Sequence, residues 1–268
     1  MRKFIILSLT FSLTLLIIFI VVLQTVGFET EKFNNIISKK VYQNNKNINI
    51  KLSTVKFKLD IKEISLYLET ENPSIDYQNI VIPVKNIKLY IDFFSLIKSE
   101  AQIKKINLVF KEFEIHELKK ISKIFKPSNF KSFLRDKVQN GKINAEIEIY
   151  LNDKNLLDNF IARGSVTHFS VKIYKNIVLE KTSFTFTADK TDVLIKKIFS
   201  ESDQFKIKQG DLKVKLSPEI NLTSNFRSSL KYNGQSKDLK RLFSNFRNIE
   251  NFSLLDLELT NYFSVNFD

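Results

Sequence analysis

The stretch KINAEIEIYL, residues 142–151, alternates apolar and polar side chains from Ile143 to its end. Its apolar members are Ile143, Ala145, Ile147, Ile149 and Leu151. A β-strand points successive side chains to opposite faces, so a period of two predicts a strand with one buried and one solvated face. A helix would instead need apolar residues three and four positions apart. The stretch therefore indicates amphipathic β-structure.

The same period recurs on both sides of this stretch. Upstream, the alternating apolar residues are Val55, Phe57, Leu59, Ile61, Ile64, Leu66, Leu68, Ile87, Leu89 and Ile91. Beside Pro83 the alternation of apolar and polar residues shifts by one position, which predicts a bulge or strand break. Further strand-like runs lie at 103–110, 113–115, 161–166, 169–174, 177–179, 184–188, 193–199, 205–207, 212–216, 220–222, 230–232 and 255–259. Short strands separated by turn residues predict an antiparallel meander, since parallel pairing needs a long crossover each time.

Helical spacing is confined to a few short segments. It predicts amphipathic helices at 31–43, 118–125, 130–138 and 237–246, with Gly141 as the C-cap of the third. These helices cannot cover every apolar strand face, so the sheet must fold on itself, close into a barrel or leave an apolar groove. We predict a mainly β fold, an elongated antiparallel β-meander forming a taco-like groove, while a closed core stays the alternative.

The first residues predict a membrane segment. Twenty residues without a charge, 4–23, form a helix of about 30 Å, enough to cross the hydrocarbon of a bilayer. A cleaved signal peptide would have a shorter apolar run followed by small residues, so we expect an uncleaved signal anchor over 4–26. Its apolar surface includes Phe4, Leu13, Leu16, Ile20 and Leu23.

Charges on either side of this segment predict its orientation. Arg2 and Lys3 precede the apolar run, and Glu29 and Glu31 follow it. The positive-inside rule then places residues 1–3 in the cytoplasm and exports residues 27–268 as one β-domain.

The net charge by itself excludes few classes of binding partner. The chain has 42 Lys and Arg against 29 Asp and Glu, a net charge of +13, which would suit nucleic acid, anionic lipid or an acidic partner. Only six of these cations are arginine, and lysine accompanies abundant asparagine and isoleucine, as A+T-rich coding produces. We therefore expect no nucleic-acid partner. Cysteine is absent, which excludes disulfides and thiolate metal sites.

Motifs for catalysis are not found in the sequence. His116 and His168 stand without a second histidine at metal-binding spacing, and five glycines do not form a phosphate-binding loop. Glu146 and Glu148 share a polar strand face, where pairing with lysines of neighbouring strands is the simpler interpretation. We expect a protein without catalytic residues, metal or cofactor.

Several stretches together resemble a known family. They are GFETEKFN (27–34) after the apolar helix, LYIDFFSLIKSE (89–100) followed by IKKINL (103–108), and VQNGKI (138–143) with ARGSV (162–166) and Thr185-Phe186. In this order they resemble the AsmA-like family of bacterial inner-membrane-anchored periplasmic proteins, which includes the TamB and YhdP types. The likeness is one of strand phase and turns along nearly the whole chain.

The resemblance implies a function in lipid transfer. It implies an apolar groove that binds phospholipid and guides it toward the outer membrane, lined here by Val55, Phe57, Leu59, Leu66, Ile87, Leu89, Ile147 and Ile149. Family members are commonly longer, so this chain is either the N-terminal part of a longer protein or works with a periplasmic or outer-membrane protein partner. The rival hypothesis is an anchored structural or assembly factor whose closed β-sandwich binds a protein. An outer-membrane barrel comes third, because its precursor would lose the N-terminal helix.

Overall fold

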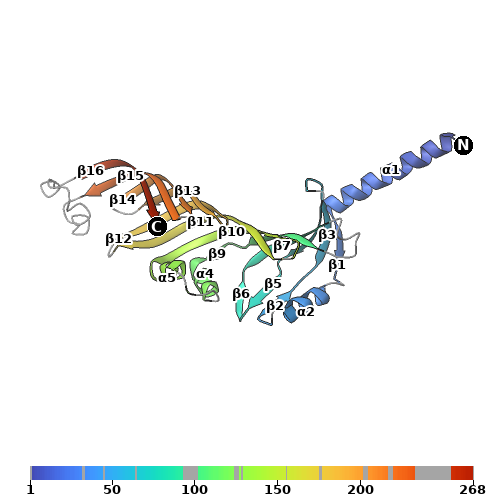
Figure 1. Ribbon diagram of the computed structural model, residues 1–268, viewed down its shortest axis with the longest axis horizontal. Coiled ribbons are helices and arrows are strands. Elements are labelled where there is room, and N and C mark those ends of the chain that lie inside the picture. The colour runs from blue at the N-terminus through green and yellow to red at the C-terminus, as the bar shows by residue number, and fades with distance from the viewer. Residues whose placement is uncertain are drawn as a thin grey trace. The chain divides into compact units, whose positions relative to one another are not determined.

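The structure is a computed structural model of the chain (Figure 1). It describes residues 2–31, 34–44, 46–63, 65–92, 102–123, 127, 129–154, 156–174, 177–201, 205–216, 220–232 and 255–267. The helix predicted at 237–246 and most of the turn in the stretch 89–100 lie outside these residues.

Strands make up most of the described chain, which confirms the mainly β prediction. The described helices are α1 Arg2–Thr25, α2 Asn34–Asn44, α4 Ile115–Ser122 and α5 Asn129–Asp136. The strands are β1 Phe28–Thr30, β2 Ile48–Lys51, β3 Val55–Asp60, β4 Ser65–Glu71, β5 Ser74–Tyr77, β6 Ile80–Ile82, β7 Val84–Ile91, β8 Ile103–Phe110, β9 Phe113–Glu114, β10 Val138–Leu151, β11 Leu157–Tyr174, β12 Ile177–Ala188, β13 Asp192–Glu201, β14 Phe205–Lys215, β15 Ile220–Tyr232 and β16 Leu255–Phe267.

The strands pair in an order that nearly follows the chain. The large sheet runs β1-β3-β4-β7-β8-β10-β11-β12-β13-β14-β15-β16, with β9 beside β10, and β2, β5 and β6 form a small separate sheet. Every strand pairing whose register is described is antiparallel, as the meander prediction requires. The chain divides into two compact units, Met1–Phe110 with Glu148–Asn159, and Lys111–Ile147 with Phe160–Asp268.

Helix α1 belongs to the first unit and is long and apolar enough to cross a membrane. Phe4, Leu13 and Leu16 are each more than half exposed, as an apolar helix without a protein partner would be. Ile20 and Leu23 are half-buried, since the end of α1 lies against β3. Length and composition thus identify α1 as a possible membrane anchor or signal sequence.

Gly27 connects α1 to the sheet. Its φ of 75° is the left-handed conformation common just beyond helix ends, and its N–H donates to the carbonyl of Val22 over 2.9 Å. A Cβ at this position would lie 2.6 Å from the carbonyl oxygen of Phe57. Only glycine therefore allows the chain to turn this closely from α1 into β1.

The strands of the second unit are longer than the sequence predicts. The periodicity divides β11 into 161–166 and 169–174, and β12 into 177–179 and 184–188, whereas each is one strand. His168 and Lys181 have φ values of 51° and 46°, and the pairing of β11 with β12 shifts register near them. Such β-bulges reverse the apolar phase without ending the strand. The predicted slip beside Pro83 is confirmed, because β6 ends at Ile82 and the β7–β8 register shifts after Val84.

Three local predictions are wrong. Gly141 is not a helix C-cap but lies inside β10 with a φ of 151°, and Val138, expected on a helix, begins that strand. Ile115 was expected to end a strand and instead begins α4. The α4 start is fixed by a capping box, in which the Glu117 side chain accepts a hydrogen bond from the backbone N–H of Glu114.

Candidate functional site

One face of the second unit is largely apolar from β12 to β15. The register places Phe186 opposite Ile195, Ile195 opposite Leu212, and Leu212 opposite Ser224. Because directly paired residues in an antiparallel sheet share a face, these side chains form a row across four strands. A second row runs through Ala188, Val193, Val214 and Leu222.

The opposite face of the same strands is polar. Thr187 pairs with Leu194, Leu194 with Lys213 and Lys213 with Thr223, so a single leucine interrupts a row of hydroxyl and ammonium groups. Asp192 and Lys213 form an ion pair of 3.7 Å on this side. The strands β12–β15 thus separate an apolar surface from a hydrated one, within one layer of sheet.

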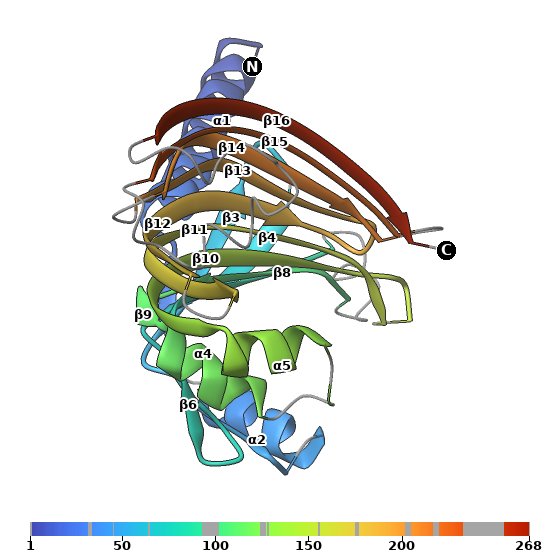
Figure 2. The ribbon, with the colours of Figure 1, turned by 90° about the vertical axis from the view of Figure 1, so that its left-hand side faces the viewer.

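The apolar face is covered at one end by helices. The space beside Gly141 is occupied by the side chains of Ile115 in α4 and Phe169 in β11, at 3.0 and 3.1 Å from where a Cβ would lie. Phe169 pairs with Thr182 on the apolar face and its ring meets Phe184 edge-on at 5.5 Å. Leu134 of α5 is 3% exposed, so α4 and α5 bury apolar surface at this end. Figure 2 shows both helices beside β10.

Away from these helices the face stays partly open. Phe186, Ile195, Leu212 and Leu222 are all half-buried, unlike the buried Val166 and Val171 of β11. In a single layer of sheet, neighbouring side chains bury one another only partly, whereas a closed core would bury them fully. Among the described residues, this face is therefore apolar and only partly buried across four strands.

Glycines on this face make room for aromatic rings. Gly164 pairs with Phe186, and a Cβ on Gly164 would lie 2.8 Å from that ring. Gly210 pairs with Phe226 and would bring a Cβ within 2.4 Å of its ring. The two rings thus lie over bare backbone, where every larger residue would displace them.

Buried hydroxyls form a small polar patch within the apolar face. Thr182 donates a hydrogen bond to Ser200 Oγ over 2.9 Å, and Ser200 donates to the carbonyl of Glu180 over 3.2 Å. Ser200, Ser224 and Ser228 are at most 5% exposed. Small side chains here let neighbouring strands and rings pack closely, and Thr182 and Ser200 have each other as partners.

The first unit also carries an apolar face. Phe57 pairs with Leu68, Leu59 with Leu66 and Leu68 with Leu89. The six predicted lining residues of this unit, Val55, Phe57, Leu59, Leu66, Ile87 and Leu89, all lie on this one face of β3, β4 and β7. Five are half-buried, whereas Val55 is 2% exposed and belongs to the packed interior. Ile147 and Ile149 are half-buried on one side of β10, alternating with Glu146 and Glu148.

The polar face of the first unit is an ordered network rather than a hydrated surface. Glu69, 7% exposed, accepts from Lys58 at 2.8 Å and from Asn86 at 2.8 Å, and Lys88 lies 3.7 Å away. Burial alone would raise the pKa of Glu69, but the hydrogen bonds from Lys58 and Asn86 and the charge of Lys88 outweigh it, and the pKa lies below its usual value. Sequence reasoning did not find this cluster, since it depends on which strands are neighbours.

Tyrosine and lysine extend this network. Tyr67 and Tyr90 stack across β4 and β7 with ring centroids 5.2 Å apart, and the Lys105 ammonium lies 4.0 Å from the Tyr90 ring while pairing with Glu63. Burial raises the pKa of Tyr90 far above its usual value. These contacts rigidify the strands that carry the apolar face on their other side.

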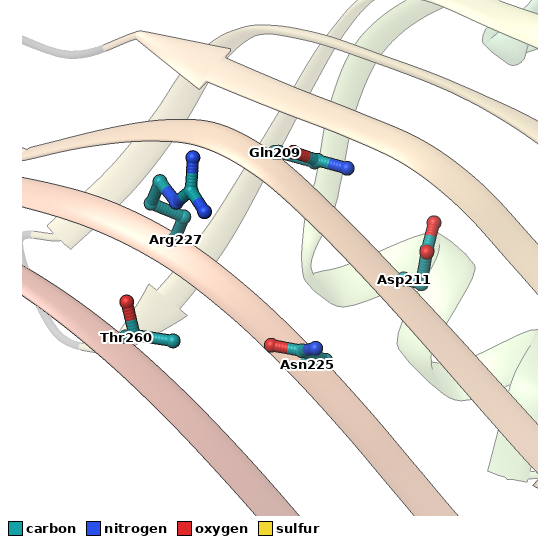
Figure 3. Close-up of a pocket in the computed structure, with 5 residues that line it drawn as sticks. All are labelled: Gln209, Asp211, Asn225, Arg227 and Thr260. Atoms are coloured by element: carbon teal, nitrogen blue, oxygen red, sulfur yellow. The ribbon is translucent and has the colours of Figure 1, made fainter.

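A shallow polar depression lies on the hydrated face of the second unit (Figure 3). It is lined by Gln209, Asp211, Asn225, Arg227 and Thr260. Arg227 pairs with both Gln209 and Thr260 across β14, β15 and β16. The Asp211 carboxylate accepts the backbone N–H of Lys197 over 3.0 Å. Lys197 has a φ of 55° beside a register shift between β12 and β13, so the carboxylate stabilises the backbone at a bulge of β13.

The two histidines lie apart at the surface. His116 is exposed on α4, 3.2 Å from the Glu114 carboxylate, and His168 is exposed at the β11 bulge. Among the described residues, His, Asp and Glu do not gather in groups of three that could hold a metal ion.

Fold and surface together define a class: a mainly β protein with one large antiparallel sheet, an apolar face on each unit and an N-terminal apolar helix. Comparison with protein-family models, curated proteins and solved structures finds no match to this chain.

Proposed function

We propose that the chain is an AsmA-like protein that binds glycerophospholipid acyl chains along the apolar face of its second unit. The observation that carries this proposal is the row of half-buried Phe186, Ile195 and Leu212, which lies on a single layer of sheet whose other side is polar. An acyl chain transferred from water to such a surface gains about 0.8 kcal/mol for each methylene fully buried.

The N-terminal helix supports a location at a membrane. In the proposal α1 stays uncleaved in a bacterial inner membrane, and Arg2 and Lys3 hold its start in the cytoplasm. The sheet then lies in the periplasm, beside the leaflet from which lipid enters. The apolar face of the first unit, with Leu66 and Leu89, is a second surface for acyl chains.

Lipid that co-purifies with the detergent-solubilised full chain tests this proposal. Ile195 and Leu194 are adjacent half-buried residues of β13 on opposite faces. We expect Ile195→Glu to lose most of the glycerophospholipid that mass spectrometry detects per protein, because a carboxylate on the apolar face excludes an acyl chain. Leu194→Glu should keep it. Lipid bound around α1 is common to both variants and cancels in the comparison.

Two results would overturn the proposal. One is equal lipid in both variants and the unaltered chain, which would place all of it around α1. The other is lipid loss with Leu194→Glu alone. Charged replacements at Leu89 and Ile147 extend the test to the first unit and to β10. A chain that carries no lipid but captures a protein would favour the rival hypothesis of an anchored assembly factor.

A further inference from the structure

The end of helix α1 is covered by protein on one face only. Ile20, Leu23 and Gly27 are three and four positions apart, so they share a face, and all three are buried or half-buried. Phe19 and Val21, on either side of Ile20, are exposed. Strand β3 contacts α1 here. One side of the helix end therefore lies against β3, while its other sides are open.

Strand β3 runs toward α1 and continues past the start of β1. Its antiparallel pairing with β1 places Val55 opposite Thr30, and Phe57 opposite Phe28, the first residue of β1. The three residues after Phe57 extend β3 by about 10 Å on the side of Phe28 from which α1 arrives. The turn between β3 and β4, residues 60–63, therefore lies beside the end of α1.

The depth of this β3–β4 turn follows from the membrane segment. The uncharged residues 4–23 match the hydrocarbon thickness of a bilayer, so Ile20 and Leu23 lie where α1 passes from hydrocarbon to headgroups. A strand end that covers these two residues has to lie at the same depth. Phe28 lies there as well, since its exposed ring is 6.0 Å from the ring of Phe19.

The side chains of the turn suit the boundary between hydrocarbon and headgroups. Ile61 is 46% exposed, and Lys62 is exposed. The Asp60 carboxylate accepts the backbone N–H groups of Lys62 and Glu63 over 3.0 and 3.3 Å, and the Glu63 carboxylate accepts from the Lys105 ammonium over 2.5 Å. Both carboxylates thus have partners within the protein. The turn presents an apolar side chain and an ammonium group, as interfacial segments of membrane proteins do.

We propose that the β3–β4 turn inserts into the boundary region of the bilayer that α1 spans, with Ile61 against acyl chains and Lys62 at lipid phosphates. The proposal rests on the membrane location of α1 proposed above. This second attachment restrains rotation of the first unit about α1. It also brings Leu59 and Leu66, the pair of the apolar face next to the turn, close to the leaflet. A lipid that leaves the leaflet meets the apolar face of the first unit at this pair.

Tryptophan fluorescence tests the depth of the turn, because the chain contains no tryptophan. The full chain with Ile61→Trp is reconstituted into vesicles of phosphatidylcholine and phosphatidylglycerol, whose acyl chains carry bromine either near the headgroup or near the chain end. We expect bromine near the headgroup to quench Ile61→Trp most strongly. Val81→Trp is the control and should keep its fluorescence, since Val81 is also exposed but lies in β6 of the small separate sheet.

Leu13→Trp, at the middle of α1, separates the turn from the anchor. Bromine near the chain end should quench it most strongly. Quenching of Leu13→Trp together with equal, weak quenching of Ile61→Trp and Val81→Trp would overturn insertion of the turn and leave the anchor in place. Absence of quenching in Leu13→Trp would overturn the membrane location and this proposal with it.

Charge reversal tests the part of Lys62. Adding Lys62→Glu to Ile61→Trp should lower quenching by bromine near the headgroup severalfold in vesicles that contain phosphatidylglycerol, because lipid phosphates repel a carboxylate. Adding Lys62→Arg instead should preserve the quenching, since the positive charge remains. Equal quenching in these two double variants would overturn the contact of Lys62 with lipid phosphates.

Discussion

At the scale of single residues, glycines set the packing of the apolar face. Gly164 and Gly210 lie on different strands, yet each has a phenylalanine ring of the next strand over its backbone. Strand glycines are unfavourable for the backbone by about 0.5–1 kcal/mol relative to alanine, so such positions need a packing reason. At Gly210 the reason is the room that the Phe226 ring requires, and at Gly164 it is the room for the Asn144 carbonyl oxygen, 2.1 Å from where a Cβ would lie, and for the Phe186 ring.

We therefore expect Gly210→Ala to destabilise the fold. The new methyl group would lie 2.4 Å from the Phe226 ring, and moving the ring should cost about 1–3 kcal/mol of unfolding free energy. Urea denaturation followed by circular dichroism measures the loss. Lys213→Ala, on the polar face of the same strand, is the control and should change stability by less than about 0.5 kcal/mol. Unchanged stability of Gly210→Ala would contradict the packing argument.

The sequence predicts on which face of its strand an apolar residue lies, but not which residues of the neighbouring strands it contacts. The alternation around Leu59 and Leu89 was enough to place them on one face, as the register confirms. The burial of Val55 and the Glu69 network depend on cross-strand partners 11 to 25 positions away, which a period of two does not specify. The packing role of Gly164 could not be predicted from the sequence for the same reason.

At the scale of elements, bulges explain why the strands were predicted to be shorter than they are. Lys181 and Lys197 adopt positive φ, and the register of β12 with β13 shifts between Ser183 and Thr185. Each bulge reverses which side chains are apolar, so a search for strict alternation ends the strand there. The prediction of a helix end at Gly141 is wrong for a related reason, since glycine occurs both at helix ends and at irregular strand positions.

Glycine substitutions at the β13 bulge should have opposite effects at adjacent positions. Lys197 has a φ of 55°, a conformation that costs residues with a Cβ about 1 kcal/mol, whereas Lys196 is regular strand. Lys197→Gly should raise the unfolding free energy by about 0.5 kcal/mol, because glycine adopts this conformation freely. Lys196→Gly should lower it by about 0.5–1 kcal/mol. Both values come from chemical denaturation, and a loss at both positions would argue against the bulge.

At the scale of the whole molecule, the composition and the two-residue period of apolar side chains predict the class of fold. The order in which the strands pair is known only from the structure. Alternation and turn residues were sufficient for a mainly β antiparallel chain, and 20 uncharged residues were sufficient for the apolar helix. The separate small sheet of β2, β5 and β6 was not predicted. Nothing in their periodicity distinguishes these short strands from those that join the large sheet.

An uncleaved anchor makes a direct prediction for the purified protein. We expect the full chain to sediment with membranes after carbonate extraction, and its intact mass to include Met1 or begin at Arg2. Replacing Leu13 and Leu16 by arginine should release it, since each arginine at the centre of a spanning helix costs about 2.5–3.5 kcal/mol. A mature N-terminus near Gly27 would identify α1 as a cleaved signal sequence instead.

The order of strands in the second unit also bears on how the chain folds. From β10 to β16, each strand is hydrogen-bonded to the one that follows it in sequence. Pairing can therefore proceed hairpin by hairpin as the polypeptide emerges, without waiting for distant segments, and topologies with local pairing fold faster than those with non-local pairing. Each completed hairpin offers a template for the next strand, so synthesis and sheet growth can advance in the same direction.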